Sequence, residues 1–376
     1  MDSTKGQNFS PDRRAWRLFQ TLARFGLDLE GAEAVREAAR GVEGRGILSL
    51  VGGEGLASFL LWGIHESGAL SLLPPPFLDA LEEIAAFERD YLVRVSLVAV
   101  QAFQALEDLQ VPYLVVKGLA LAPYWPRPML RFMSDVDILV PWEDRVKVWD
   151  NYDRFRRIQA DLGITAEVEP LHHDLTAGDT IPVDFDKLFE RSRTSRVGGR
   201  EVRIPSSLDL ALGSASSALR HDPRSLRLLL DLAFLVRSGE LDLGALAEEG
   251  RKLGLGRVLR FLFLQIQARF GLDADERILS LAQESGVERR LGLADGGGDP
   301  LPRWFAGPGL SRPFLKIRLE GFSRFLKRSV ANFFPPPLAL RNQFSRDGKQ
   351  GGFLPLLYLE HWRRRLRVLV PRRVGH

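Results

Sequence analysis

Two aspartates separated by one residue stand in a segment that is otherwise mostly apolar. Asp135 and Asp137 lie in residues 134–140 and alternate there with valine and isoleucine, a pattern typical of a β-strand. Because successive side chains of a strand point to opposite faces, both carboxylates share one face and lie about 7 Å apart. Such a pair can hold Mg²⁺ (or Mn²⁺), which takes few carboxylates and completes its shell with water and phosphate oxygens. The alternative is a solvated polar face of a strand.

A second acidic pair, Asp184 and Asp186, alternates with apolar residues over 180–186, which we also expect to form a strand. If the two strands are neighbours, at least three carboxylates converge, which is costly without a metal because like charges raise one another's pKa. Around two metal ions the same cluster is a site for in-line displacement at phosphorus. Asp184 is nearer the middle of the strand and is the predicted third metal ligand, whereas Asp186 is at its exit, where an acceptor would approach.

A lysine and a glycine end the apolar run of residues 112–116, which we expect to form a buried strand. Gly118 lets the backbone approach phosphates, and the start of a following helix favours an anion there. Lys117 and Arg131 add positive charge suited to a triphosphate. The alternatives are an ordinary lysine at a strand end and a structural ion pair between Arg131 and Asp135.

Ser134 and His173 complete the predicted substrate-binding residues. His172 and His173 are adjacent on a strand expected at 171–176, so at most one of the two imidazoles faces the site, and a structural role is the alternative. Asp231 stands in an otherwise apolar helix, where we interpret it as a buried hydrogen-bonding residue that orients the core.

Helical spacing covers residues 11–110 and returns after Pro205, whereas the residues between them mostly alternate as strands do. Gly198-Gly199 predicts a hairpin turn, and Ser206 with Asp209 predicts a helix start by a capping box. Further strands are expected at 164–169 and 201–204, and a helix at 143–162. We therefore predict an α+β protein with a small mixed-sheet core embedded between helical N- and C-terminal regions. The predicted parts are a helical region at 1–110, an α/β core at 111–205, a helical domain at 206–293, and a linker with a basic tail rich in Pro, Phe and Arg at 294–376.

The order of these features resembles the polymerase-β-like nucleotidyltransferase superfamily, and more narrowly its bacterial family of uncharacterised nucleotidyltransferases. That family shows an apolar strand ending in Lys-Gly, a helix with a tyrosine, and then Arg-x-x-x-Asp-x-Asp-x-Leu-Val. The matching residues here are Lys117, Gly118, Tyr124, Arg131, Asp135, Asp137, Leu139 and Val140. The resemblance covers about residues 90–240. The departures are Leu119, where the wider superfamily has a second glycine or a serine, and Asp186, where the family often has a histidine.

The resemblance implies transfer of a nucleoside monophosphate from a nucleoside triphosphate such as ATP to an unknown hydroxyl acceptor, with release of pyrophosphate. In this interpretation Asp135, Asp137 and Asp184 are catalytic and hold Mg²⁺ or Mn²⁺. Lys117 and Gly118 contact the β- and γ-phosphates. The main alternative is a non-catalytic nucleotide-binding protein with a regulatory or scaffold role.

The composition limits the class of protein. The 376 residues include no cysteine, which excludes disulfides, thiolate metal sites and cysteine nucleophiles. The first residues lack the apolar run of a secretory signal, and no stretch offers the roughly 20 consecutive apolar residues of a transmembrane helix. We therefore expect a cytoplasmic protein.

The net charge of +4 conceals an uneven distribution, since residues 301–376 contain 16 Lys and Arg against 3 Asp and Glu. A basic tail favours a polyanionic partner, either an anionic membrane surface or nucleic acid. Leu359, Trp362, Leu366 and Leu369 recur at helical spacing among arginines, which is typical of an amphipathic helix peripheral to a membrane. The alternative is a helix packed on the body of the protein with its arginines in water.

Overall fold

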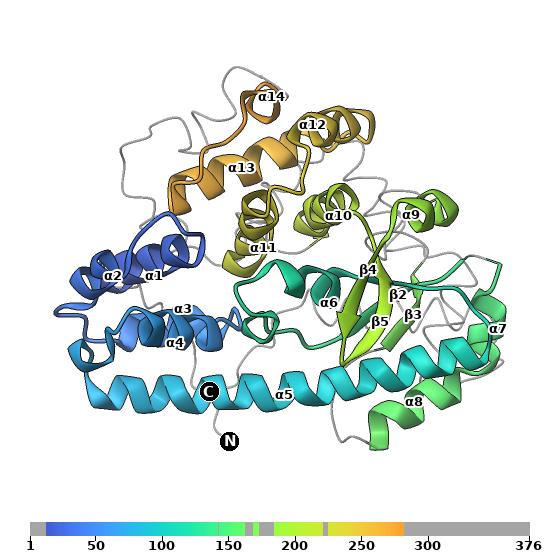
Figure 1. Cartoon of the computed structure of the whole chain (residues 1–376), viewed down its shortest axis with the longest axis horizontal. Helices are drawn as coiled ribbons and strands as arrows, with labels where there is room; N and C mark the ends of the chain where they lie inside the picture. The colour runs from blue at the N-terminus through green and yellow to red at the C-terminus, as the bar shows by residue number, and fades with distance from the viewer. Residues whose placement is uncertain (1–12, 142, 162–167, 173–183, 221–224, 282–376) are drawn as a thin grey trace, which may run out of the picture. The chain divides into compact units, whose positions relative to one another are not determined.

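The computed structural model describes residues 13–141, 143–161, 168–172, 184–220 and 225–281. The chain divides into two compact units, Met1–Pro313 and Phe314–His376, and every described residue belongs to the first. Helices and two small sheets make up the described part, which confirms the predicted α+β class (Figure 1). The basic tail with its predicted amphipathic helix lies outside the described residues.

The N-terminal region is helical, as its spacing predicts. Its elements are α1 (Arg13–Gly26), α2 (Ala32–Ala39), α3 (Arg45–Gly52), α4 (Ala57–Glu66), the 3₁₀ turn η1 (Leu70–Leu72) and α5 (Pro75–Asp108). Two prolines begin α5, where their missing N–H groups break no helical hydrogen bond. The long α5 contacts α3 and α4 at one end and the central sheet and α8 (Tyr152–Asp161) at the other (Figure 1). It therefore joins the helical region to the core.

A buried glutamate fastens α4 to α5. Glu88 of α5 is 3% exposed, and its two carboxylate oxygens accept hydrogen bonds from the backbone N–H groups of Ala57 and Ser58 at 3.1 and 2.8 Å. These N–H groups belong to the first turn of α4 and have no partner within that helix. The negative charge of the carboxylate also interacts favourably with the positive end of the helix dipole. Glu88 thus caps α4 from a neighbouring helix.

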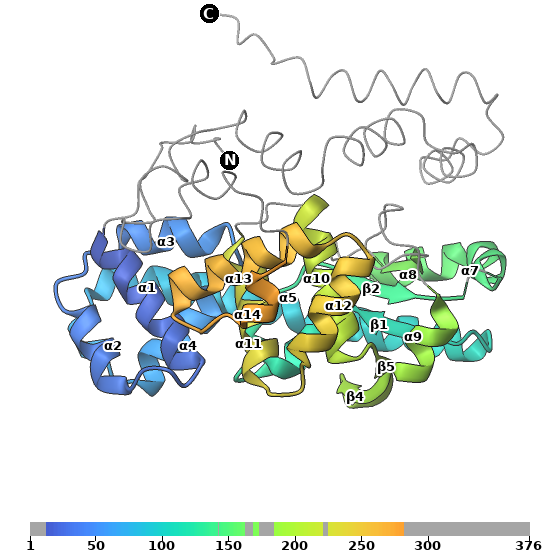
Figure 2. The ribbon, with the colours of Figure 1, turned by 90° about the horizontal axis from the view of Figure 1, so that it is seen from above.

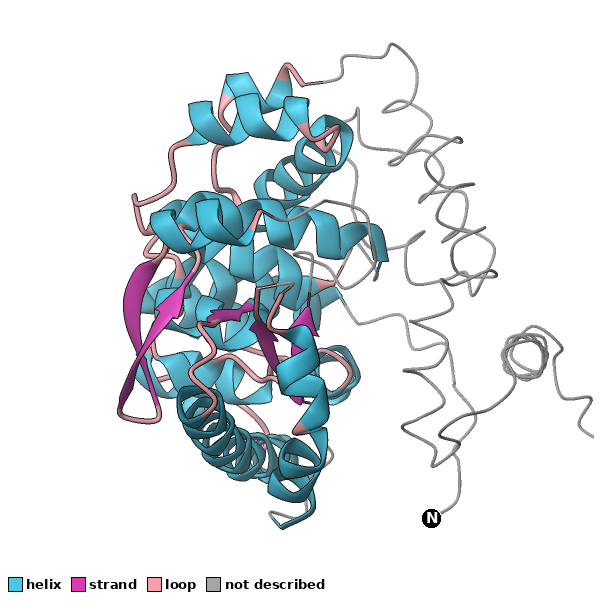
Figure 3. Ribbon diagram, turned by 90° about the vertical axis from the view of Figure 1, so that its right-hand side faces the viewer, coloured by secondary structure: helices cyan, strands magenta, loops and turns pink. Residues whose placement is uncertain are grey.

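The central sheet has the strand order β1 (Leu114–Val116), β2 (Val136–Leu139) and β3 (Val168–His172). β1 and β2 are antiparallel and pair Val116 with Asp137, whereas β2 and β3 are parallel, so the sheet is mixed as predicted. β4 (Arg193–Val197) and β5 (Arg200–Ile204) form a separate antiparallel hairpin that contacts β1 and α5 (Figure 3). Gly198 and Gly199 have φ values of +56° and +80°, which confirms the predicted hairpin turn.

The prediction of a strand at 180–186 is wrong for residues 184–186, the part of this segment that the structure describes. Asp184 is the N-cap of α9 (Phe185–Arg191), and residues 173–183 lie outside the described residues. The Asp184 carboxylate accepts a hydrogen bond from the backbone N–H of Lys187 at 3.2 Å, as a helix N-cap does. Apolar side chains of α9 at helical spacing pack against β1 and β2, namely Phe185, Leu188 and Phe189. The alternation with apolar residues fits a strand, but aspartate is favoured at helix N-caps and the apolar contact of α9 with the sheet favours the helix.

Two other predictions concern helix boundaries. The helix expected at 143–162 consists of α7 (Arg145–Asp150) and α8, which are interrupted at Asn151. The capping interaction at α10 (Ser207–Arg220) is confirmed, because Ser206 Oγ accepts from the Asp209 N–H at 3.2 Å and donates to its carboxylate at 2.6 Å.

The chain continues with α11 (Leu226–Arg237), α12 (Leu243–Lys252), α13 (Gly256–Phe270) and α14 (Glu276–Leu279). α13 contacts both α11 and α1, so helices from the two ends of the described chain pack together (Figure 2). None of the helices in the described ranges is long and apolar enough to span a membrane.

The capping role of Glu88 predicts a specific loss of stability. Glu88→Gln places an amide NH₂ beside a backbone N–H and leaves one donor of α4 unsatisfied, which costs about 1–3 kcal/mol of the free energy of unfolding. Urea denaturation followed by circular dichroism measures the change. Glu83→Gln on the exposed side of α5 is the matched control, and equal stability of the two variants would contradict the capping role.

Candidate active site

A cavity of about 300 Å³ lies among the end of β1, the start of β2, α10 and α11. The chain passes from β1 to β2 through α6 (Lys117–Leu121) and the 3₁₀ turns η2 (Ala122–Tyr124) and η3 (Pro128–Leu130). Six predicted site residues line the cavity: Lys117, Gly118, Arg131, Ser134, Asp135 and Asp137. Tertiary structure adds lining residues from 205–217 and 225–231, which are distant in sequence from these six.

Asp135 and Asp137 line the cavity together, although the strand predicted at 134–140 is shorter and begins at Val136. Asp135 directly precedes β2 and is exposed, as is the neighbouring Ser134, whereas Asp137 within β2 is only 4% exposed. Asp137 pairs across the sheet with Val116, the last residue of β1. The acidic pair is therefore next to the turn that Lys117 and Gly118 form.

Lys117 contacts the buried member of the acidic pair. Its Nζ lies 2.5 Å from Oδ1 of Asp137. The Lys117 backbone has a φ of +52°, in the left-handed region that costs a residue with a side chain about 1 kcal/mol or more. The Asp137 carboxylate thus forms an ion pair with the Lys117 ammonium inside the cavity. The backbone conformation of Lys117 is unfavourable by itself.

Gly118 leaves room for a buried guanidinium. A Cβ atom at this position would lie 2.8 Å from Nη1 of Arg131 and 3.2 Å from Cβ of Met133. Arg131 is 7% exposed, so its side chain has little space to move away. Close packing against Arg131 therefore explains why a glycine stands at this position. Its contact with phosphates stays a prediction.

Arg131 forms a bidentate ion pair with Asp231 of α11. Arg131 Nε lies 2.7 Å from Oδ1 of Asp231, and Nη2 lies 2.7 Å from Oδ2. The indole Nε1 of Trp125 donates to the same Oδ1 at 2.8 Å. The structural partner of Arg131 is therefore Asp231 rather than Asp135, the partner considered from sequence. Asp231 is 4% exposed, which confirms its interpretation as a buried hydrogen-bonding residue.

Arg227 lines the cavity from the first turn of α11 and is a site residue that was not predicted from the sequence. Its Nη1 donates to the carbonyl oxygen of Phe132 at 3.2 Å. Burial lowers the pKa of Arg227, the nearby charge of Arg131 lowers it further, and nearby carboxylates act in the opposite direction. The available signal was a basic residue at the start of a helix that is otherwise rich in leucine.

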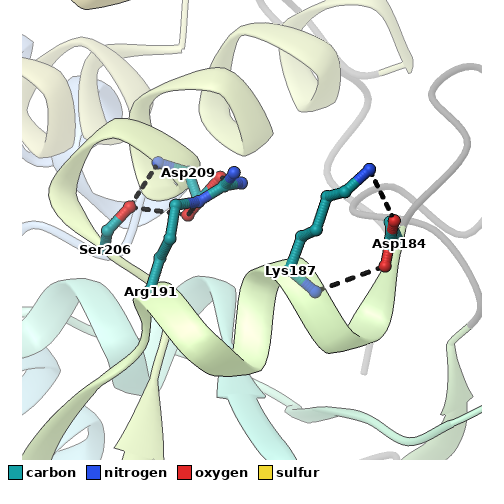
Figure 4. A network of polar contacts seen from close by, with 5 residues as sticks. All are labelled: Asp184, Lys187, Arg191, Ser206 and Asp209. Carbon is teal, nitrogen blue, oxygen red and sulfur yellow. Dashed lines mark hydrogen bonds and ion pairs between the residues drawn. The ribbon is translucent and has the colours of Figure 1, made fainter.

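Another buried carboxylate, that of Asp209, connects α9 to the wall of the cavity. Asp209 is 1% exposed and accepts hydrogen bonds from Nη2 and Nε of Arg191 at 2.6 and 3.2 Å (Figure 4). Arg191 is the last residue of α9. This ion pair and the apolar packing of α9 on the sheet fix that helix beside the site.

Asp184 and Asp186 are exposed on α9 and do not line the cavity. The Asp184 carboxylate lies 2.9 Å from Lys187 Nζ, and hydrogen bonding to Lys187 lowers the pKa of Asp184 (Figure 4). In the described ranges, no three His, Asp or Glu side chains are grouped so that they could hold a metal ion. The roles of Asp184 as third ligand and of Asp186 near an acceptor stay predictions, and His173 lies outside the described residues.

The Lys-Gly turn after β1 and the Asp-x-Asp segment at the start of β2 line one cavity. A sequence profile of the family described as uncharacterised nucleotidyltransferase matches residues 43–151 and 156–271, more than half of the chain. The chain belongs to this family, and the matched segments contain every residue that lines the cavity. Neither the curated proteins nor the solved structures contain a match to the chain.

The Arg131–Asp231 pair predicts a large loss of stability when one charge is removed. Asp231→Asn leaves a buried guanidinium without its counter-charge, which lowers the free energy of unfolding by about 3–5 kcal/mol. Urea denaturation of the variant and of the wild type measures this difference in the free energy of unfolding.

An exposed ion pair supplies the control. Glu66 Oε1 lies 2.8 Å from Nη2 of Arg127, and both side chains are exposed to solvent. Glu66→Gln costs at most about 1 kcal/mol, because water screens the pair. Equally small effects of the two substitutions would refute the importance of the buried pair.

Proposed function

We propose that this protein transfers a nucleoside monophosphate from a nucleoside triphosphate to a hydroxyl acceptor and releases pyrophosphate. The observation that carries the proposal is the placement of Asp135 and Asp137 in one cavity with the Lys117-Gly118 turn. Membership of a nucleotidyltransferase family supports a nucleotide as the substrate.

Asp135 and Asp137 fit a site for Mg²⁺ or Mn²⁺. Both offer hard carboxylate oxygens to the same cavity, and the Lys117 ammonium at 2.5 Å from Asp137 indicates that this carboxylate can receive a cation. Mg²⁺ binds through one or two carboxylates where substrate phosphates and water supply the remaining ligands. A metal bound there would neutralise negative charge on the phosphates during transfer.

The other residues of the cavity would bind and position the substrate. Lys117 would give positive charge to the phosphates, whose oxygens compete with Asp137 for its ammonium, and Gly118 would let them approach the backbone. Ser134 is exposed beside Asp135 and can donate its hydroxyl hydrogen to the substrate. Arg131 is engaged with Asp231, so we propose that it positions the acidic segment against α11.

A nucleotide-binding protein without turnover is the second candidate, and one observation favours it. Asp184, the predicted third metal ligand, is exposed at the N-cap of α9 and does not line the cavity. Binding of a nucleotide requires the cations and the acidic pair but no third carboxylate. Turnover therefore separates the two candidates.

The test is incubation of the full chain with each α-labelled nucleoside triphosphate, Mg²⁺ and a cell extract as the source of acceptor. We expect label on an acceptor together with released pyrophosphate, and loss of both on addition of EDTA. Binding of a nucleoside triphosphate without label transfer or pyrophosphate release would favour the second candidate.

Substitutions in the acidic pair test the site itself. Asp135→Asn and Asp137→Asn each lower the transfer rate by about a hundredfold or more, because each removes a metal ligand while keeping the side-chain volume. Loss of a residue that only hydrogen-bonds a metal ligand already costs about 10–100-fold. Asp79→Asn, an exposed aspartate on α5, is the matched control. A double variant that transfers label at the wild-type rate would place the active site elsewhere.

A further inference from the structure

The cations that line the cavity differ in how their charge is balanced. Lys117 is paired with Asp137, and Arg131 is paired with Asp231. Within the part of the chain that the structure describes, Arg227 forms no ion pair, and its guanidinium bonds the carbonyl oxygen of Phe132 instead. Among the described residues that line the cavity, Arg227 is thus the cation that has no carboxylate bound directly to it.

This arrangement is costly for the folded protein. A guanidinium that loses water gains less from a carbonyl oxygen than from a carboxylate, and the lowered pKa of Arg227 reflects that burial. A guanidinium has five N–H donors in a fixed fork, and the bond to Phe132 uses one of its nitrogens. The remaining donors suit an anion that enters the cavity.

Two contacts fix the position of Arg227 relative to the acidic pair. The bond to the carbonyl oxygen of Phe132 ties Arg227 to the segment that leads directly into Ser134 and Asp135. The N-cap of α11, Ser225, donates its hydroxyl hydrogen to Glu54 Oε2 at 2.7 Å, which anchors the first turn of the helix. The N-terminal end of this 12-residue helix adds positive potential at the same place.

We propose that Arg227 binds the β- and γ-phosphates of the nucleoside triphosphate, and the pyrophosphate that leaves, through its guanidinium fork. The inference rests on the proposed function and extends it to a residue of α11, outside the Lys-Gly and Asp-x-Asp segments. A planar guanidinium fork holds phosphate oxygens in pairs, which a lysine ammonium cannot do, and the two terminal phosphates offer the largest number of such oxygens.

The test is calorimetric titration of the full chain, in Mg²⁺ without acceptor, with the best-bound nucleoside triphosphate, its monophosphate and inorganic pyrophosphate. Arg227→Met should weaken binding of the triphosphate and of pyrophosphate between about tenfold and about a hundredfold, the range expected for hydrogen bonds to charged groups. Binding of the monophosphate should not change. Arg227→Lys keeps a positive charge at this partly buried position and should lose less affinity than Arg227→Met, because only the fork is removed.

Controls separate this inference from the proposed function. Arg89→Met removes an exposed arginine of α5 and should bind all three ligands like the wild type. Thermal unfolding establishes that each variant is folded. Wild-type affinity of folded Arg227→Met for the triphosphate and pyrophosphate would overturn the inference, as would an equal loss for the monophosphate. A wild-type protein that binds none of the ligands would instead refute the proposed function, and this inference with it.

Discussion

The buried ion pair between Arg131 and Asp231 sets the geometry of the cavity. It joins the segment before β2 to α11, 100 residues further along the chain, through two hydrogen bonds of 2.7 Å. Removing both charges from water is costly, so the pair is stable only in a geometry that satisfies their hydrogen bonds, and Trp125 supplies a further donor. Gly118 packs against the same guanidinium. The turn after β1, the acidic pair and the first turn of α11 are therefore held around one space.

Features that depend on neighbouring residues could be predicted from the sequence. The hairpin at Gly198-Gly199 follows from the positive φ that glycine adopts easily. The capping interaction of Ser206 with Asp209 follows from the distance of three residues between an N-cap and the third helical position. The strand that contains Asp137 follows from the alternation of aspartate with valine and isoleucine, although β2 begins only after Asp135.

Features that depend on distant contacts could not be predicted in this way. Aspartate is favoured at helix N-caps, but the alternation with apolar residues over 180–186 also fits a strand, so the packing of α9 on the sheet decides the conformation that begins at Asp184. Nothing in the local sequence relates Arg131 to Asp231, because their pairing is made by the fold. The same holds for Arg227, whose place in the cavity depends on the angle at which α11 packs against the rest of the core.

The proposed function requires that the acidic pair hold a divalent cation together with a nucleoside triphosphate. Titration of the full chain with Mn²⁺, followed by electron paramagnetic resonance with and without a non-hydrolysable nucleoside triphosphate, tests it directly. We expect bound Mn²⁺ that increases when the nucleotide is present and that disappears in the Asp135→Asn/Asp137→Asn double variant. Nucleotide-dependent Mn²⁺ binding of wild-type strength in that double variant would show that the metal binds elsewhere.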